Sequence, residues 1–203
     1  MPDKNLIVAC VQNRLFVHFI VQPIGLYFAY PVFEYFGVHL RGPIPSWTIF
    51  IRDFMVSNVL NDFLFYWAHR TLHHKLLYKH FHKQHHMFNV SIGLASEYAH
   101  PVEDLFANLI PTLAGCLLMG SHATILWSWL TLRMLQTIDT HSGYSFEWSP
   151  FNLIHWYSGS RRHDFHHSHN QGCYGAGRLW DVLMGTDKEY LEYELKLANQ
   201  KAL

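Results

Sequence analysis

The chain has 203 residues, which suits one sizeable domain rather than two. Its 15 Lys and Arg residues balance 15 Asp and Glu residues, so no basic excess indicates nucleic acid as a partner. Only 15% of the residues are charged, against about 25% in an ordinary soluble domain, and half are apolar. This deficit of charge suits a lipid bilayer.

Four apolar runs follow one another along the chain, at residues 15–37, 47–68, 105–119 and 122–138. As helices these runs would be about 22–35 Å long, against a hydrocarbon core of about 30 Å. We therefore predict one all-α domain over residues 1–203, an integral membrane bundle of about four apolar helices. A buried helical bundle in a soluble protein is the alternative. The N-terminus lacks the layout of a cleaved signal peptide.

The 17 histidines are the outlier in the composition, because imidazole is the commonest metal ligand in proteins. Eight of them form three sets with the spacing HxxxH, HxxHH and HxxHH: His69 and His73; His82, His85 and His86; and His163, His166 and His167. Residues i, i+3 and i+4 of a helix lie within an arc of about 100°, so we expect each trio to aim three imidazoles at one point. Facing sets of this kind can surround two metal ions.

The number and type of these side chains narrow the chemistry. Imidazole suits Zn, Cu, Fe and Ni, and a structural zinc site needs only four ligands. Eight histidines therefore predict two metals with open positions. A histidine-rich protein that stores, senses or transports metal is an alternative from a different class. A transporter, however, would place its ligands within the membrane spans.

Other polar residues near the three sets are further candidates. His141 follows the fourth apolar run directly and is expected to be a ninth ligand. One polar stripe on the second run is expected to face the bundle interior: Asn58, Asp62, Tyr66, His69 and His73. Five residues are candidates either for a ligand or for a group that hydrogen-bonds a ligand: His74, His100, Asp62, Asp139 and Asp164. The alternatives are a loop hydrogen bond for His100 and an interfacial helix-end charge for Asp62.

The side of the membrane follows from the order of the runs. Two runs separate the first two histidine sets from the third, so all three sets should emerge on one side. That side carries several basic residues, namely Arg70, Lys75, Lys79, Lys83, Arg161 and Arg162. The turn at Gly120 and Ser121 carries none. The positive-inside rule therefore predicts a histidine-rich helical cap in the cytoplasm that holds a dimetal centre.

The three boxes resemble the signature of the fatty acid hydroxylase / sterol desaturase superfamily over about residues 40–190. The segments SEYAHP at 96–101, TIDTHSGY at 137–144 and GTD at 185–187 are most similar to those of 4-methylsterol monooxygenases. The resemblance implies an endoplasmic reticulum membrane enzyme, with the eight box histidines as ligands of two irons (zinc can replace iron in purified protein). It also implies O2 as oxidant and electrons from NAD(P)H through cytochrome b5 or its reductase.

The implied reaction is oxidation of the C4 methyl group of a sterol. The alternatives are hydroxylation or desaturation of a fatty acyl or sphingoid chain, or of a sterol at C-5. Three positions depart from many relatives: Asn61 and Gln136, where an acidic residue is common, and Ser145, where some have His or Asp. The N-terminal part is also shorter than usual, which implies one span fewer.

Overall fold

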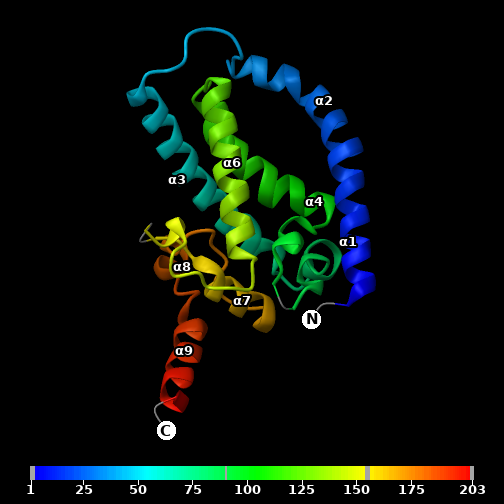
Figure 1. Ribbon diagram of the computed structural model, residues 1–203, viewed down its shortest axis with the longest axis vertical. Coiled ribbons are helices and arrows are strands. Elements are labelled where there is room, and N and C mark those ends of the chain that lie inside the picture. The colour runs from blue at the N-terminus through cyan, green and yellow to red at the C-terminus, as the bar shows by residue number, and fades with distance from the viewer. Residues whose placement is uncertain (1–2, 90, 154–155, 202–203) are drawn as a thin grey trace.

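The computed structural model describes residues 3–89, 91–153 and 156–201 and shows a helical protein (Figure 1). Within these ranges the chain forms helices, turns and two isolated β-bridges, His39 to His122 and Tyr157 to Gly177, and no strand. The all-α prediction is therefore confirmed for the described part of the chain.

A long N-terminal helix arches along one side of the molecule (Figure 1). It consists of three consecutive segments: α1 (Lys4–Phe16), a π-helical turn (Val17–Val21) and α2 (Gln22–Tyr35). Asp3 caps its start, because the Asp3 carboxylate accepts a hydrogen bond from the backbone N–H of Asn5 at 3.1 Å. In α1, Cys10 packs into a small apolar cluster with Phe88 and Tyr98, whereas α2 buries no residue.

The central helix is α3 (Trp47–Leu72), which packs closely against α5 (Ile110–Leu118). Their close approach depends on Gly115, where a Cβ atom would lie only 2.2 Å from the Cα of Ser57. Polar groups pair across this contact. The Ser57 hydroxyl lies 3.4 Å from the Cys116 thiol, and Asn61 accepts a hydrogen bond from Thr112 at 3.3 Å.

The interior face of α3 differs from the predicted polar stripe in the first half of the helix. Asn58 is exposed, whereas its neighbour Ser57 is fully buried. Towards the end of the helix, Tyr66 and His69 are buried as predicted. The difference arises because α5 approaches α3 at Gly115 and covers the face that carries Ser57.

A helical hairpin follows the second histidine box. Its segments are α4 (Pro101–Glu103), a π-helical turn (Asp104–Leu109), α5 and then α6 (Ala123–Thr140). The predicted turn at Gly120 and Ser121 is present. Gly120 has φ of +55°, and the Ser121 N–H donates back to the carbonyl of Cys116 at 2.9 Å, which ends α5. The indole of Trp129 ties α6 to α5 by donating to the Thr112 carbonyl at 2.8 Å.

The C-terminal part adds three helices below α3 and α6 in Figure 1: α7 (Gly159–His169), α8 (Leu179–Met184) and α9 (Lys188–Lys201). Asn170, with φ of +58°, ends α7 in the left-handed conformation. Phe165 of α7 contacts the rings of Tyr190 and Tyr193, which attaches the base of α9 to the molecule.

Two of the helices are long and apolar enough to cross a membrane, by length and composition: Lys4–Tyr35 and Pro101–Leu118. The runs at 47–68 and 122–138 also form helices, α3 and α6, but within the described residues these two helices do not pass this test. The reason in α3 is visible, since charged residues such as Arg52 and Asp53 interrupt its apolar sequence. A bundle of four membrane-crossing helices therefore stays a prediction.

Candidate metal centre

Nine histidines from four parts of the chain converge at the C-terminal ends of α3 and α6. They come from the end of α3, the two turns after it, the end of α6 and helix α7. Their ring nitrogens form two groups, each with all its ligand atoms within 4.8 Å of one another: His69, His73, His82, His86 and His166; and His85, His141, His163 and His167. The structure thus brings together all eight box histidines and the predicted ninth, His141.

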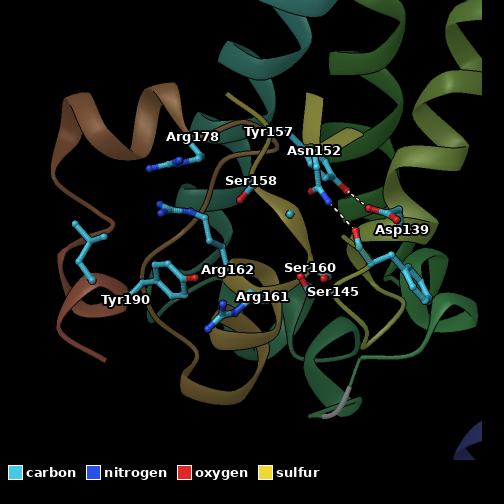
Figure 2. A pocket seen from close by; sticks show the side chains of 13 residues that line it. Asp139, Ser145, Asn152, Tyr157, Ser158, Ser160, Arg161, Arg162, Arg178 and Tyr190 are labelled. Atoms are coloured by element: carbon cyan, nitrogen blue, oxygen red, sulfur yellow. Dashed lines mark hydrogen bonds between the residues drawn. The ribbon is translucent and has the colours of Figure 1, made fainter. Parts of the chain in front are cut away.

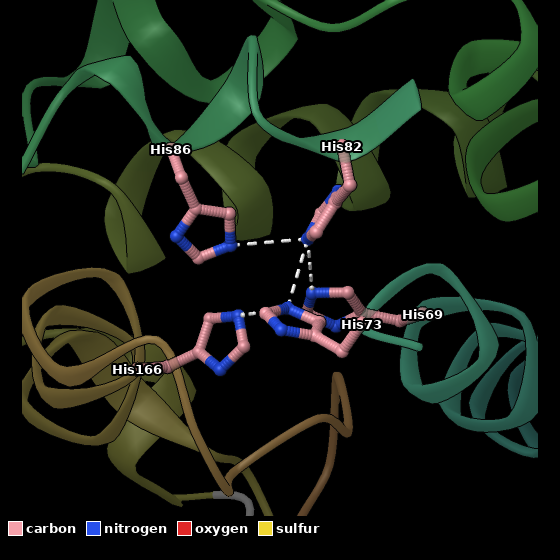
Figure 3. A group of neighbouring side chains, drawn as sticks. All are labelled: His69, His73, His82, His86 and His166. Carbon is pink, nitrogen blue, oxygen red and sulfur yellow. Dashed lines mark hydrogen bonds between the residues drawn. The ribbon is translucent and has the colours of Figure 1, made fainter. Parts of the chain in front are cut away.

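The first group is centred on His82 (Figure 3). Its Nε2 lies 2.9 Å from Nε2 of His73, 3.0 Å from Nε2 of His86 and 3.1 Å from Nε2 of His69. Nε2 of His166, from α7, lies 3.1 Å from Nε2 of His73. Five ring nitrogens therefore point into one small volume.

The second group is equally compact. Nε2 of His163 lies 2.7 Å from Nε2 of His141 and 3.0 Å from Nε2 of His167. Nε2 of His85 lies 3.3 Å from Nε2 of His141. The two groups adjoin, because the rings of His86 and His167 stack at 4.6 Å between centroids. Two ions would therefore be neighbours.

The expectation that each HxxHH trio aims at one point was wrong. In the second box, His82 and His86 belong to the first group, whereas His85 belongs to the second. The third box divides in the same manner, with His166 separated from its two companions. In the third box, which lies on α7, the reason is helical geometry: positions i+3 and i+4 lie about 100° apart around a helix, on opposite sides of position i. The second box lies on two short turns, one that ends at His82 and one that begins at His85. Each HxxHH box therefore serves both groups.

The outward-facing nitrogens of several rings are fixed by hydrogen bonds. Nδ1 of His69 donates to the Tyr174 carbonyl at 2.8 Å, and Nδ1 of His166 donates to the Gly172 carbonyl at 2.7 Å. Nδ1 of His141 likewise donates to the carbonyl of Thr137 at 2.8 Å. A neutral imidazole with its proton on Nδ1 has a free lone pair on Nε2. These contacts therefore orient the lone pairs into the two groups.

A buried carboxyl group lies behind His82. Oε1 of Glu103 is 2.9 Å from Nδ1 of His82, a close contact whose geometry is not that of a hydrogen bond. On the inner side, Nε2 of His82 faces Nε2 of His69 at 3.1 Å, and His69 has its proton on Nδ1. Facing lone pairs repel, whereas a cation between them would be bound by both. The ring orientations therefore fit a metal ion.

The electrostatics agree with this fit. Burial lowers the pKa of His85, His163 and His166 well below the usual range of an imidazole, and the neighbouring rings lower it further. The rings are therefore neutral near pH 7 and their lone pairs are available. A donor set of imidazoles alone suits iron, zinc, copper or nickel. Two adjoining groups of five and four nitrogens exceed what one structural zinc requires.

The remaining candidate residues make other contacts among the described residues. His74 is exposed, and Nδ1 of His100 accepts the backbone N–H of Val102 at 3.1 Å as a helix cap. Asp139 accepts hydrogen bonds from Ser149 and Tyr157, while Asp164 is half-buried on α7. These four lie outside both histidine groups.

Asp62 contacts the backbone rather than a ligand imidazole. Its Oδ1 accepts the N–H of Gly177 at 2.7 Å. Asp181 accepts the N–H groups of Tyr174 and Gly175 at 2.8 and 2.9 Å. The two carboxylates thereby hold the loop whose Tyr174 carbonyl orients His69. The expected effect of Asp62 on a ligand is therefore indirect.

Glu103 and Asp181 were missed by the sequence analysis. The sequence held a signal for Glu103, because an acidic residue beside an apolar run of membrane length is unfavourable in free energy unless a partner contacts it. The sequence held no comparable signal for the carbonyls of Gly172 and Tyr174, because any residue supplies a carbonyl.

Fold and site define a helical protein with two apolar helices of membrane length and a paired histidine centre. Residues 54–186 match the family model described as fatty acid hydroxylase, and the chain belongs to this family. No solved structure matches the chain significantly.

Three relatives show the range of named activities. A very-long-chain aldehyde decarbonylase of Oryza sativa subsp. indica is 43% identical over 185 residues, 89% of this chain and 69% of the relative. Methylsterol monooxygenase 2-2 of Arabidopsis thaliana is 40% identical over 185 residues, with the same two shares. Methylsterol monooxygenase 1 of Rattus norvegicus is 38% identical over 190 residues, 93% of this chain and 64% of the relative. These relationships indicate a lipid or sterol oxidoreductase.

Proposed function

We propose that this protein is an O2-dependent lipid monooxygenase that binds two irons, one in each histidine group. The observation that carries the proposal is the convergence of nine buried or half-buried imidazoles into adjoining groups of five and four. When bound, two irons would supply the activation of O2 and the oxidation of an unreactive C–H bond, which side chains cannot perform. His74, His100, Asp139 and Asp164 are not part of this proposed ligand set.

The chain's own residues hold the rings and exclude water. Carbonyl groups hold His69 and His166 from behind and Glu103 lies against His82, so these rings need little reorganisation when a metal binds. His166 is fully buried and His82 is 1% exposed, whereas His73 is half-buried, so protein atoms shield most of the first group from water. A shielded, rigid centre protects a reactive oxidant from side reactions with water.

The proposed substrate is a sterol, oxidised at its C4 methyl group. Support comes from the Arabidopsis and rat relatives, both of which are named as methylsterol monooxygenases. A long-chain aliphatic substrate is the second candidate, because the rice relative is named as a very-long-chain aldehyde decarbonylase. Either substrate is apolar and would approach from a membrane.

We place the protein in the endoplasmic reticulum membrane, with the histidine groups facing the cytoplasm. The membrane location is supported by two helices of membrane length. The orientation is supported by the basic residues around the histidine boxes. Electrons from NAD(P)H would then arrive through a cytoplasm-facing cytochrome b5-type donor or its reductase.

Metal analysis of the full chain tests the proposed centre. The purified protein should hold two irons and consume O2 with the lipid substrate when supplied with electrons. His85→Ala should lose the metal of the second group and O2-dependent turnover, because only three of its imidazoles remain. The control is His74→Ala, an exposed neighbour of the first box, which should behave as the unmodified protein. One tightly bound zinc, or full turnover in His85→Ala, would contradict the proposal.

Lipid profiles of cells that lack the protein distinguish the substrates. Accumulation of 4-methylsterols would support the sterol reaction. Accumulation of a long-chain aldehyde, acyl or sphingoid precursor would support the second candidate instead.

A further inference from the structure

Tyr66 is a buried tyrosine next to the metal centre that is not part of either histidine group. It lies on α3, one turn before His69, and its side chain is fully buried. A tyrosine hydroxyl is polar, so its burial is favourable only when the hydroxyl has hydrogen-bond partners. These partners and the rings around Tyr66 form one connected path.

A series of aromatic rings connects the first histidine group with the protein surface through Tyr66. The ring of Tyr174 contacts those of His73 and His166, at 5.0 and 5.6 Å between centroids. The Tyr66 ring follows at 6.5 Å from Tyr174, and Trp180 lies 6.4 Å from Tyr66. Trp180 is half-buried on α8, so the series ends close to the surface. Such spacings are those of aromatic rings in contact, over which an electron passes readily from ring to ring.

The hydroxyl of Tyr66 belongs to a hydrogen-bond chain that runs in one direction. Arg70 donates to its oxygen at 3.0 Å. Thr186 donates its own proton to Oδ1 of Asp181 at 2.7 Å, so Thr186 must accept in its 3.1 Å contact with Tyr66. Asp181 is fully buried, and burial raises the pKa of its carboxyl, which favours uptake of a proton. The phenol proton of Tyr66 is therefore directed towards a proton acceptor one hydroxyl away.

The rings and the hydrogen bonds together supply what the one-electron oxidation of a tyrosine requires. A phenol that loses an electron becomes a strong acid, so its oxidation is easier when a positioned group takes the proton. From Tyr66 the electron can leave through Tyr174, while the proton leaves on the other side through Thr186. Packing alone would require neither of these two connections.

Tyr157 provides a comparison, because it has the hydrogen bond without the ring path. It lies in the polar pocket between the end of α6 and α7, where Figure 2 shows it beside Asp139. Its hydroxyl donates to the Asp139 carboxylate at 2.8 Å. Its ring, however, contacts Phe151 at 5.5 Å and, among the described residues, no histidine of the two groups. A carboxylate that accepts the proton is thus available to both tyrosines, whereas the ring path to the metal centre is present at Tyr66.

We propose that Tyr66 is a redox-active residue that protects the histidine groups when an oxidant forms at the metal centre without a substrate. The proposal rests on the proposed function, which supplies that oxidant. Tyr66 gives one electron through Tyr174 to the centre, which is reduced by one electron. The phenol proton moves to Thr186, and the proton of Thr186 moves to Asp181. Trp180 then returns one electron to Tyr66, which recovers its proton by the same route, and a soluble thiol supplies the electron that restores Trp180 and is itself oxidised.

Photo-oxidation of the metal-free, full-length protein in detergent tests the path without the metal. A ruthenium tris-bipyridine complex, oxidised by a light flash with a sacrificial acceptor, removes one electron from the protein. Electron paramagnetic resonance then records the long-lived radical, since an enclosed radical outlives those of exposed rings. We expect a tyrosyl signal that is lost in Tyr66→Phe and in Thr186→Val, and kept in Thr186→Ser. The matched control is Tyr157→Phe, which should keep the signal. An equal signal in Tyr66→Phe, or loss in Tyr157→Phe instead, would overturn the proposal.

The protective role is tested with iron-loaded protein and hydrogen peroxide in the absence of lipid substrate. Mass spectrometry of the peptides that carry the histidine boxes measures oxidised histidine. Its amount should rise in Tyr66→Phe and stay at the level of the unmodified protein in Tyr157→Phe. Equal amounts in the two variants would overturn the protective role. If the unmodified protein bound no iron, the proposed function would fail, whereas the photo-oxidation experiment would still decide whether Tyr66 is redox-active.

Discussion

At the scale of single residues, the direction of several imidazoles depends on the groups that lie behind them. The spacing of the histidine boxes was enough to predict the eight histidines that the structure brings together, and the place of His141 after an apolar run was enough to predict the ninth. The same spacing did not reveal the groups that hold His69, His141 and His166 from behind. Those groups are backbone carbonyls, whereas Glu103, which lies against His82, has a side chain that can be changed directly.

Replacing Glu103 tests this positioning role. Glu103→Ala should weaken metal binding about 10–100-fold, because His82 loses the carboxyl group that lies 2.9 Å behind its ring and limits its orientation. Glu103→Gln should have a smaller effect, since an amide of the same size keeps the ring in place. Competition with a chelator of known affinity measures both changes.

Asp104→Asn is the control. The carboxylate of Asp104, the residue next to Glu103, pairs with Arg14 at 3.7 Å and contacts no histidine of the two groups among the described residues. It should leave metal affinity unchanged. An equal loss of affinity in both variants would mean that the whole segment, and not the contact to His82, is responsible.

At the scale of elements, the contact between α3 and α5 fixes the height and rotation of the helix that carries His69 and His73. The sequence predicted both helices and the turn after α5. The predicted interior face of α3 was correct at Tyr66 and His69 but not at Asn58, because polar residues occur on two adjoining stripes. The deciding feature is Gly115, and only the packing of the two helices shows that its missing side chain is required.

A methyl group at this contact should destabilise the protein. Gly115→Ala would place a Cβ 2.2 Å from the Cα of Ser57, so the helices must separate. Overpacking of this kind costs about 1–3 kcal/mol of the free energy of unfolding, and backbone contact favours the upper end. Thermal unfolding in detergent measures the change. Gly25→Ala is the control: its Cβ would meet nothing within 4 Å, so its stability should be equal or slightly higher.

At the scale of the whole molecule, the buried rings tie stability to pH. Burial lowers the pKa of His163, His166 and His167 in the folded protein, whereas in the unfolded chain each imidazole titrates near its usual value of about 6.5. As the pH falls below about 6.5, the unfolded state takes up protons that the folded state does not. The free energy of unfolding of metal-free protein should therefore be highest above this pH and decrease below it.

Denaturant unfolding of chelator-treated protein between pH 8 and pH 5 (about the range of imidazole titration) measures this effect. The metal-loaded protein should be more stable throughout, because metal binds the folded state. Stability that does not change across this range in the metal-free protein would mean that the rings are less enclosed than their burial indicates.

The whole arrangement was predictable only in part. The order of the apolar runs correctly placed the histidine boxes together, because two intervening helices return the chain to the same end. The apolar character of α3 was overestimated, since its polar residues are satisfied by partners on α5 and on the loop at Gly177. Such pairings join segments far apart in sequence, and residue type alone does not reveal them.

The division of each HxxHH box between the two groups has a consequence for how the centre is loaded. The short segment that carries His82 and His86 of the first group also carries His85 of the second. A substitution that displaces the backbone of this segment should therefore lower the metal content of both groups together, and protein with an intact second group beside a damaged first one should not result from it.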